Sequence, residues 1–183
     1  MRKFLLTLTD ARLRAVLGAL KASGPGLGDL AEDPGAAPAF FRPPRARLRR
    51  ASAAAPSSSP AAPLALAAAE EFTARLEKVF SDMALHAAAP DPAVKEALLY
   101  LQQACAEARG LLSLGGRAGA FARIKGLAAG AHKNLALARA AAASAPEDFP
   151  QNLKFSSIYS GLDAVFYAYE RCAEALFTVT SQR

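Results

Sequence analysis

The stretch Leu153–Gln182, LKFSSIYSGLDAVFYAYERCAEALFTVTSQ, decides the fold of this chain. With about 100° between successive residues of a helix, its large apolar side chains fall on one stripe. They are Phe155, Ile158, Tyr159, Leu162, Phe166, Tyr169, Ala173, Leu176 and Phe177. Small residues beside the stripe, such as Gly161 and Ala168, allow a close neighbour, so this helix is predicted to pack against two partners. It indicates a helical bundle, a scaffold compatible with many functions.

The composition supports an all-α fold. The 183 residues include no Trp and many Ala, and they provide one domain plus a tail. Residues 1–63 contain ten Lys and Arg against four Asp and Glu, whereas residues 64–183 contain twelve of each. All of the net charge of +6 therefore lies in the first third of the chain. The Ala-rich run at 51–69 is interrupted by proline and serine, so no transmembrane helix is predicted.

Residues 1–23 are predicted to form a short amphipathic helix. Leu13, Val16, Leu17 and Leu20 share one face, and Ser23-Gly24-Pro25-Gly26 ends the helix. A lone helix of this length is marginal in water. Three alternatives therefore stay open, namely docking on the bundle, docking on a partner, or a basic element of an organellar presequence.

Residues 24–63 are predicted to be a disordered linker or arm. Proline is frequent there, and no sustained periodicity is evident. The arm carries five arginines, Arg42, Arg45, Arg47, Arg49 and Arg50. Arg49-Arg50-Ala51-Ser52 also resembles the site of basophilic kinases, so Ser52 is a candidate for phosphorylation.

Three further helices are predicted after the arm, at about 65–88, 92–113 and 117–144. Asp91 and Pro92 have the residue types of an N-cap and a first helical position. Together with the helix at 153–182, these segments predict an up-down four-helix bundle over residues 64–183.

The helix at 117–144 is basic. It contains no Asp or Glu, and Arg123, Lys125 and Lys133 lie on it. Gly126 and Gly130, four residues apart, are predicted to allow a neighbouring helix to approach. These three cations and the five arm arginines are the predicted partner-binding residues.

No catalytic or metal-binding motif is evident. Neither His86 nor His132 has a Cys, His, Asp or Glu three or four residues after it, and no phosphate-binding glycine loop occurs, so no metal, cofactor or catalytic residue is predicted. Cys105 and Cys172 fall on apolar helix faces and are predicted to be buried thiols. An enzyme would require a pocket formed by tertiary contacts, for which the candidates are Tyr100, Tyr159, Tyr169 and a histidine.

Part of the chain resembles a known family. Phe121, Ile124, Leu127, Gly130, Ala131 and Lys133 fall in the frame Phe-x-x-Ile-x-x-Leu-x-x-Ala-Ala-x-Lys. This segment is similar to the third helix of PsbQ-type extrinsic subunits of photosystem II, which are four-helix bundles behind a Pro-rich arm. The resemblance covers about 95–170 and implies a subunit of the thylakoid lumen. Residues 1–69, with the twin arginine Arg49-Arg50, would then be a targeting sequence.

These observations favour a non-catalytic, soluble helical bundle that binds an acidic protein partner as a subunit of a larger complex. The basic arm is expected to anchor it. An alternative is an electrostatic binder of nucleic acid or of an anionic membrane, which the same arginines would serve. The second alternative is the PsbQ-like lumenal subunit. Both a cytoplasmic and an organellar location agree with the sequence.

Overall fold

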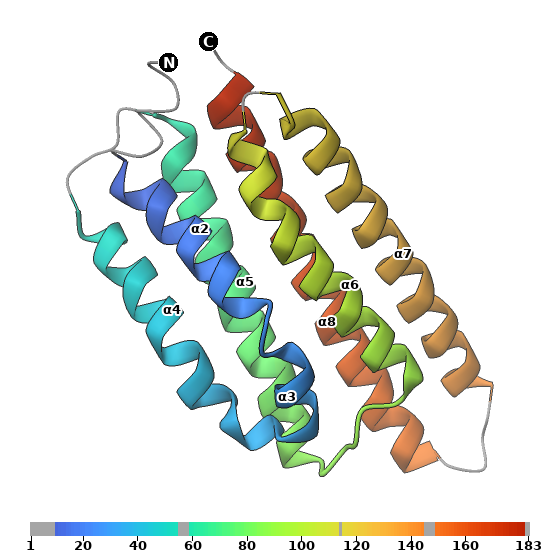
Figure 1. The fold of residues 1–183 in the computed structure, drawn as a ribbon. Helices are drawn as coiled ribbons and strands as arrows, with labels where there is room; N and C mark the ends of the chain where they lie inside the picture. The colour runs from blue at the N-terminus through green and yellow to red at the C-terminus, as the bar shows by residue number, and fades with distance from the viewer. Residues whose placement is uncertain (1–9, 55–58, 114, 145–148, 182–183) are drawn as a thin grey trace.

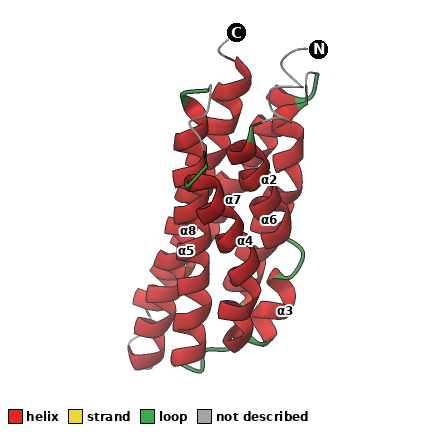
Figure 2. Ribbon diagram, turned by 90° about the vertical axis from the view of Figure 1, so that its left-hand side faces the viewer, coloured by secondary structure: helices red, strands yellow, loops and turns green. Residues whose placement is uncertain are grey.

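The computed structural model describes residues 10–54, 59–113, 115–144 and 149–181, and within these ranges it is helical with no strand (Figures 1 and 2). The α-helices are α2 (Ala11–Ser23), α3 (Leu27–Glu32), α4 (Ala37–Ser52), α5 (Ala61–Leu85), α6 (Pro92–Glu107), α7 (Arg117–Ala143) and α8 (Phe149–Ser181). Two short 3-10 helices are η1 (Pro34–Ala36) and η2 (Ala108–Leu112). The predicted all-α fold is confirmed. None of the described helices is long and apolar enough to cross a membrane.

Helix α8 has the two packing sides that its sequence predicts. Its main partner is α5, and α7 packs along another side (Figure 1). Phe166 and Tyr169 on the predicted stripe are fully buried, and so are Ala168 and Cys172 on the neighbouring arc of small residues. At Gly161 a Cβ atom would lie 2.8 Å from a methyl carbon of Val79, so the missing side chain lets α5 pack closely on α8 there.

The predicted up-down four-helix bundle is not what the structure shows. In such a bundle α5 and α6 would be neighbours, but these two helices hardly touch. Helix α2 contacts both of them and lies between them, while α4 covers α2 and α5 from outside (Figure 1). The helices α2, α4, α5, α6, α7 and α8 thus share one hydrophobic core. The sequence prediction was wrong because helix periodicity identifies a buried face without identifying what covers it.

Helix α2 docks on the bundle, in agreement with the first of the three alternatives for residues 1–23. Asp10 caps its first turn by accepting hydrogen bonds from the backbone N–H groups of Arg12 (2.8 Å) and Leu13 (3.3 Å). Val16 and Leu20 are fully buried. Burial of this face supplies the stabilisation that a lone short helix lacks. Residues 1–9 lie outside the described residues.

The predicted disorder of residues 24–63 is also wrong for most of the segment, because residues 27–52 are helical. Helix α4 buries a stripe with helical spacing, formed by Ala37, Phe41, Pro44, Leu48 and Ala51. Phe41 stacks on Phe80 of α5 with ring centroids 6.4 Å apart. The periodicity was present in the sequence, but the prolines obscured it. Residues 55–58 are not among those described.

Pro43 and Pro44 lie inside α4, where each removes one backbone hydrogen bond. An interior proline costs about 3 kcal/mol or more. Burying a side chain such as Phe41 or Leu48 contributes about 1.5–3 kcal/mol. Both are fully buried, so packing against α2 and α5 offsets much of the cost. A helix that is weak on local propensity is thus held by tertiary contacts.

The start of α6 is the one predicted, whereas α5 ends at Leu85, a few residues before the predicted end. Asp91 is the N-cap of α6 and accepts a hydrogen bond from the backbone N–H of Val94 (2.8 Å), and Pro92 occupies the first turn, as predicted. Before it, Ala87 lies two residues after the last residue of α5 and has a positive φ of 47°. The N–H of Ala88 donates to the carbonyl of Met83 (2.9 Å), which completes a left-handed C-terminal cap.

Candidate functional site

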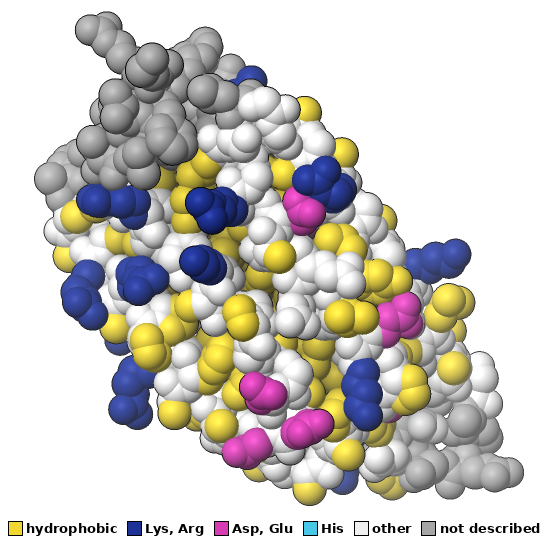
Figure 3. Space-filling model, viewed as in Figure 1, with side chains coloured by type: hydrophobic (Ala, Val, Ile, Leu, Met, Phe, Trp, Pro, Cys, Tyr) yellow, Lys and Arg dark blue, Asp and Glu magenta, His cyan; other side chains and the backbone are white. Residues whose placement is uncertain are grey.

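A basic face covers the outer side of α2 and α4. We define it by Arg14, Arg42, Arg47, Arg49 and Arg50, all of which are exposed. Neither helix contains an Asp or Glu, and none of these five arginines forms an ion pair with any described carboxylate. Figure 3 shows basic side chains over the part of the surface where Figure 1 places α2 and α4. Acidic side chains gather elsewhere on this view.

The basic face contains a shallow depression between α2 and α4 with a volume of about 410 Å³. Arg14, Arg47 and Arg50 line it, and its other lining residues are alanines. Arg47 lies across α2, where a Cβ atom at Gly18 would collide with its guanidinium. The absence of a side chain at Gly18 lets this arginine lie flat on the helix. Three guanidinium groups with an apolar floor form a favourable site for carboxylate or phosphate oxygens.

Two other arginines of this region have structural roles. Arg45, predicted to bind a partner, forms an ion pair with Glu77 and so connects α4 to α5. Arg12 of α2 donates hydrogen bonds to the carbonyls of Ala51 (3.5 Å) and Ala54 (3.3 Å) at the end of α4. These contacts fix the orientation of α4 on the bundle. The basic face is therefore a rigid surface and not a flexible arm.

The basic residues predicted on the helix at 117–144 are largely neutralised by neighbouring carboxylates. Arg123 donates to Glu107 at 2.8 Å, and Lys125 donates to Glu170 and Glu174, each at 2.9 Å. The hydrogen bond with Glu107 raises the pKa of Arg123. The hydrogen bonds with Glu170 and Glu174 raise the pKa of Lys125. These two cations connect α7 to α6 and α8.

The predicted partner-binding residues therefore form two separate groups. Lys133 on α7 is exposed and has no ion pair with a described carboxylate, unlike Arg123 and Lys125. Helix α7 lies at the opposite side of the bundle from α4 (Figure 1). The chain brings the α2 and α4 arginines together and does not bring the α7 cations to them. The sequence missed Arg14 as a member of the basic face because the prediction treated α2 and the arm as unconnected.

His132 belongs to a charged network between α7 and α8. Its Nδ1 lies 2.6 Å from Asp163 and its Nε2 lies 3.2 Å from Glu170, and the ring packs on Tyr167 with centroids 4.3 Å apart. Arg139 donates to the second oxygen of Asp163 at 3.3 Å. Both ring nitrogens are thus occupied by carboxylates. The sequence missed this network because the carboxylates lie on another helix.

The residues expected for an enzyme do not converge. Tyr100 donates to Glu96 on its own helix at 2.9 Å, and Tyr159 donates to Asp91. Tyr169 is buried and donates to a backbone carbonyl of α6. Within the described residues, no group of three or more Cys, His, Asp or Glu could hold a metal ion.

Both cysteines are buried free thiols, as predicted. Burial raises the pKa of Cys172 to about 12, and burial raises the pKa of Cys105 further. Both thiols are protonated at neutral pH, so neither is a nucleophile there.

Ser52 is the last residue of α4 and is exposed next to Arg49 and Arg50. A phosphate there would add negative charge beside the basic face. Its phosphorylation stays a prediction.

The fold and the site together define an all-α bundle with a basic face on two packed helices, whose arginines form no ion pair with the carboxylates that the structure describes. Comparisons of the chain with protein-family models, curated proteins and solved structures gave no match. The PsbQ-type resemblance stays a sequence-based prediction. If residues 1–69 were removed as a targeting sequence, the loss of α2, α4 and the start of α5 would uncover the core that they bury.

Proposed function

We propose that this protein is a non-catalytic helical bundle that binds an acidic partner protein through the basic face of α2 and α4. In this role it acts as a subunit of a larger assembly. The proposal rests on a difference in ion pairing between the arginines of the basic face and cations elsewhere on the bundle. Within the described part of the chain, the five arginines of the basic face form no ion pair with a carboxylate, whereas Arg75, Arg123 and Lys125 elsewhere on the bundle are each paired.

Unpaired arginines held on packed helices favour recognition of carboxylates. A guanidinium group can bind both oxygens of a carboxylate in a planar arrangement, and a rigid backbone limits the entropy that binding costs. Ion pairs at Arg75, Arg123 and Lys125 neutralise some of the cations on other helices. An acidic helix or loop of a partner is complementary to this face in charge.

The surroundings of the basic face favour protein over membrane or nucleic acid. Among the residues that the structure describes, the exposed large apolar ones are Leu64, Leu85, Leu99, Leu137, Phe149, Leu153 and Tyr167, and none of them lies on α2 or α4. Phe41 is fully buried and Phe40 is partly buried. The face therefore lacks apolar groups for insertion into a bilayer and exposed rings for stacking on bases.

The test compares two triple variants with the same change in charge. Arg42, Arg47 and Arg50 are replaced by Gln in one, and Lys95, Lys133 and Lys154 are replaced by Gln in the other. Each full-length variant is used for affinity purification from the native source at several salt concentrations. We expect the arginine variant to lose the partner and the lysine variant to retain it. Equal recovery of the same partners by both variants would refute the proposal.

The same variants distinguish the alternative binding classes. If the wild-type protein binds duplex DNA, RNA or phosphatidylserine vesicles at physiological salt, and only the arginine variant loses that binding, the ligand is a phosphate-bearing surface. That result, without a recovered acidic protein, would replace protein binding by the electrostatic alternative.

A further inference from the structure

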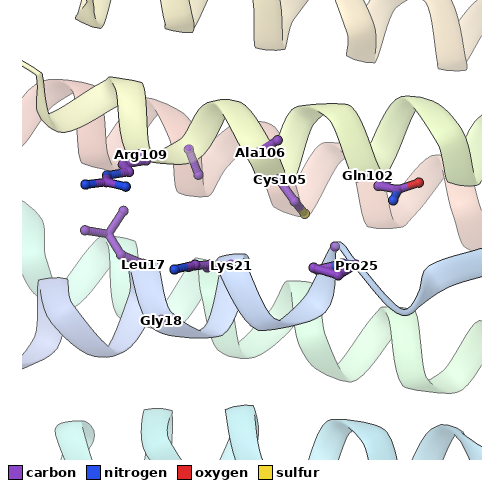
Figure 4. Close-up of a pocket in the computed structure, with 10 residues that line it drawn as sticks. Leu17, Gly18, Lys21, Pro25, Gln102, Cys105, Ala106 and Arg109 are labelled. Atoms are coloured by element: carbon purple, nitrogen blue, oxygen red, sulfur yellow. The ribbon is translucent and has the colours of Figure 1, made fainter.

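A groove lies on the other side of α2 from the basic face, between this helix and α6. It has a volume of about 590 Å³. Figure 4 shows Leu17 of α2 and Arg109 of η2 facing each other across the groove, with Lys21 one helical turn further along α2. Lys21 and Arg109 are exposed, and neither forms an ion pair with a described carboxylate. The groove thus presents two cations beside the side chain of a leucine.

Gly18 connects this groove to the depression between α2 and α4. Arg14, Gly18 and Lys21 are four and three residues apart, so they share one stripe of α2. Arg47, which lines the depression, lies over Gly18, and Gly18 also lines the groove. The cations of the two hollows therefore form a continuous row across α4, α2 and η2. We call it the cation row and define it by Arg14, Lys21, Arg47, Arg50 and Arg109.

The cation row crosses the helices, and this direction determines the shape of its ligand. Packed helices lie about 8–10 Å apart, so the path from α4 over α2 to η2 is about 16–20 Å long. An extended chain advances about 3.3 Å per residue, so about six residues cover the path. Alternate side chains of an extended segment point to the same side, which lets them enter the hollows on both sides of α2.

Leu17 determines what the ligand carries besides acidic groups. Its side chain packs against the hydrophobic core and is only partly buried, and Ala106 lies on the opposite wall of the groove. Gly18 and Ala106 contribute no large side chains to the lining, which leaves room for one side chain of the ligand next to Leu17. An apolar side chain is favoured there, because its burial removes apolar surface from water.

We propose that the acidic partner binds through an extended segment that crosses α2 at Gly18 and has acidic residues on both sides of one large apolar residue. The apolar side chain lies against Leu17 in the groove between α2 and α6. The neighbouring carboxylates bind the cation row. This inference rests on the proposed function, because both use arginines of the basic face, and it adds the shape and the apolar residue of the partner.

The test uses two synthetic acidic octapeptides and the full-length protein. Both peptides alternate Asp and Glu except at the fifth position, which is Leu in one peptide and Ala in the other. Titration calorimetry measures the two affinities at the same salt concentration. We expect the Leu peptide to bind about tenfold more tightly, because more apolar surface leaves water. Equal affinities would overturn the inference.

Three variants locate the segment on the protein. Ala106→Phe, at an exposed position of the lining, is expected to fill the groove and weaken binding of the Leu peptide about tenfold, to the level of the Ala peptide. The double variant Lys21→Gln and Arg109→Gln is expected to weaken both peptides about tenfold. The control Lys95→Gln and Lys133→Gln has the same change in charge and is expected to bind normally. Circular dichroism confirms folding, and an unchanged preference for the Leu peptide in folded Ala106→Phe would overturn the placement in the groove.

The triple variant with Arg42, Arg47 and Arg50 replaced by Gln separates a failure of this inference from a failure of the proposed function. If neither peptide binds, or if the triple variant binds both as wild type does, the basic face does not recognise carboxylates and both proposals are wrong. If wild type binds both peptides equally and the triple variant loses them, the basic face binds acidic protein without an apolar contact, and only this inference is wrong.

A deoxythymidylate octamer tests the other class of extended polyanion. We expect it to bind more weakly than the Leu peptide at physiological salt. Tighter binding of the octamer that the triple arginine variant loses would overturn the assignment to a peptide and make the ligand a single-stranded nucleic acid.

Discussion

Replacing Leu20 by Ala tests whether α2 is an integral part of the bundle. Leu20 has no exposed surface and lies on the buried face of α2, which packs between α5 and α6. The substitution removes three carbon atoms, which at about 0.8 kcal/mol each correspond to about 2.4 kcal/mol of lost burial. The cavity left behind raises the expected loss in the free energy of unfolding to about 3–4 kcal/mol.

The assay is urea unfolding followed by circular dichroism at a helical wavelength, because the chain contains no Trp for fluorescence. The matched control is Leu99→Ala on α6, where the side chain is 52% exposed. We expect the control to change the free energy of unfolding by less than about 0.5 kcal/mol. If Leu20→Ala also cost less than about 1 kcal/mol, α2 would not be part of the core, and the six-helix arrangement would be wrong.

Three further changes test particular features. Ala87→Gly is expected to raise the free energy of unfolding in urea by roughly 0.5–1 kcal/mol, because Ala87 has a positive φ that glycine adopts without strain. A loss of stability would contradict the left-handed C-terminal cap after α5. Gly126→Ala is expected to raise the free energy of unfolding by about 1 kcal/mol, since a Cβ atom there would contact nothing within 4 Å. A loss of stability would instead show that another part of the protein contacts α7 at Gly126.

The third change concerns alkaline pH. Burial raises the pKa of Cys105 and Cys172 in the folded state, whereas the thiols of the unfolded chain ionise at about pH 9. Their contribution to the free energy of unfolding is therefore complete below about pH 9 and decreases as the pH rises further. At pH 10 each thiol is expected to lower the free energy of unfolding by about 1.4 kcal/mol relative to neutral pH. Under reducing conditions, a double Cys→Ala variant should therefore lose about 3 kcal/mol less than wild type between pH 7.5 and pH 10. An equal loss would mean that the thiols are not buried.

Local sequence signals were sufficient for most helix positions. The stripe of Leu153–Gln182 identified α8 and its buried face, and Asp91 with Pro92 identified the start of α6. The predicted close approach of a neighbouring helix at Gly126 was wrong, because the spacing of glycines alone does not show whether a neighbour is present. At Gly130 the expected close approach does occur, with Tyr100 at 3.4 Å from the Cβ position.

The candidate site was predicted only in part. Arg42, Arg47, Arg49 and Arg50 were identified from their charge, and they lie on the exposed side of α4. The order of α4 was missed because its prolines weaken local helix propensity, while the contacts that stabilise it come from α2 and α5. The sequence therefore located the basic charge but not the rigid surface that presents it.

What the sequence determined by itself is the helical class, the start of α6 and the buried face of α8, because these depend on local spacing and capping. Only the tertiary structure decided that α2 lies between α5 and α6, that Arg45 and Lys125 are paired, and that Lys21 and Arg109 face one groove. The spacing of apolar residues predicts which face of a helix is buried. The covering helix, and the side chains that meet across it, depend on how all the helices share one core.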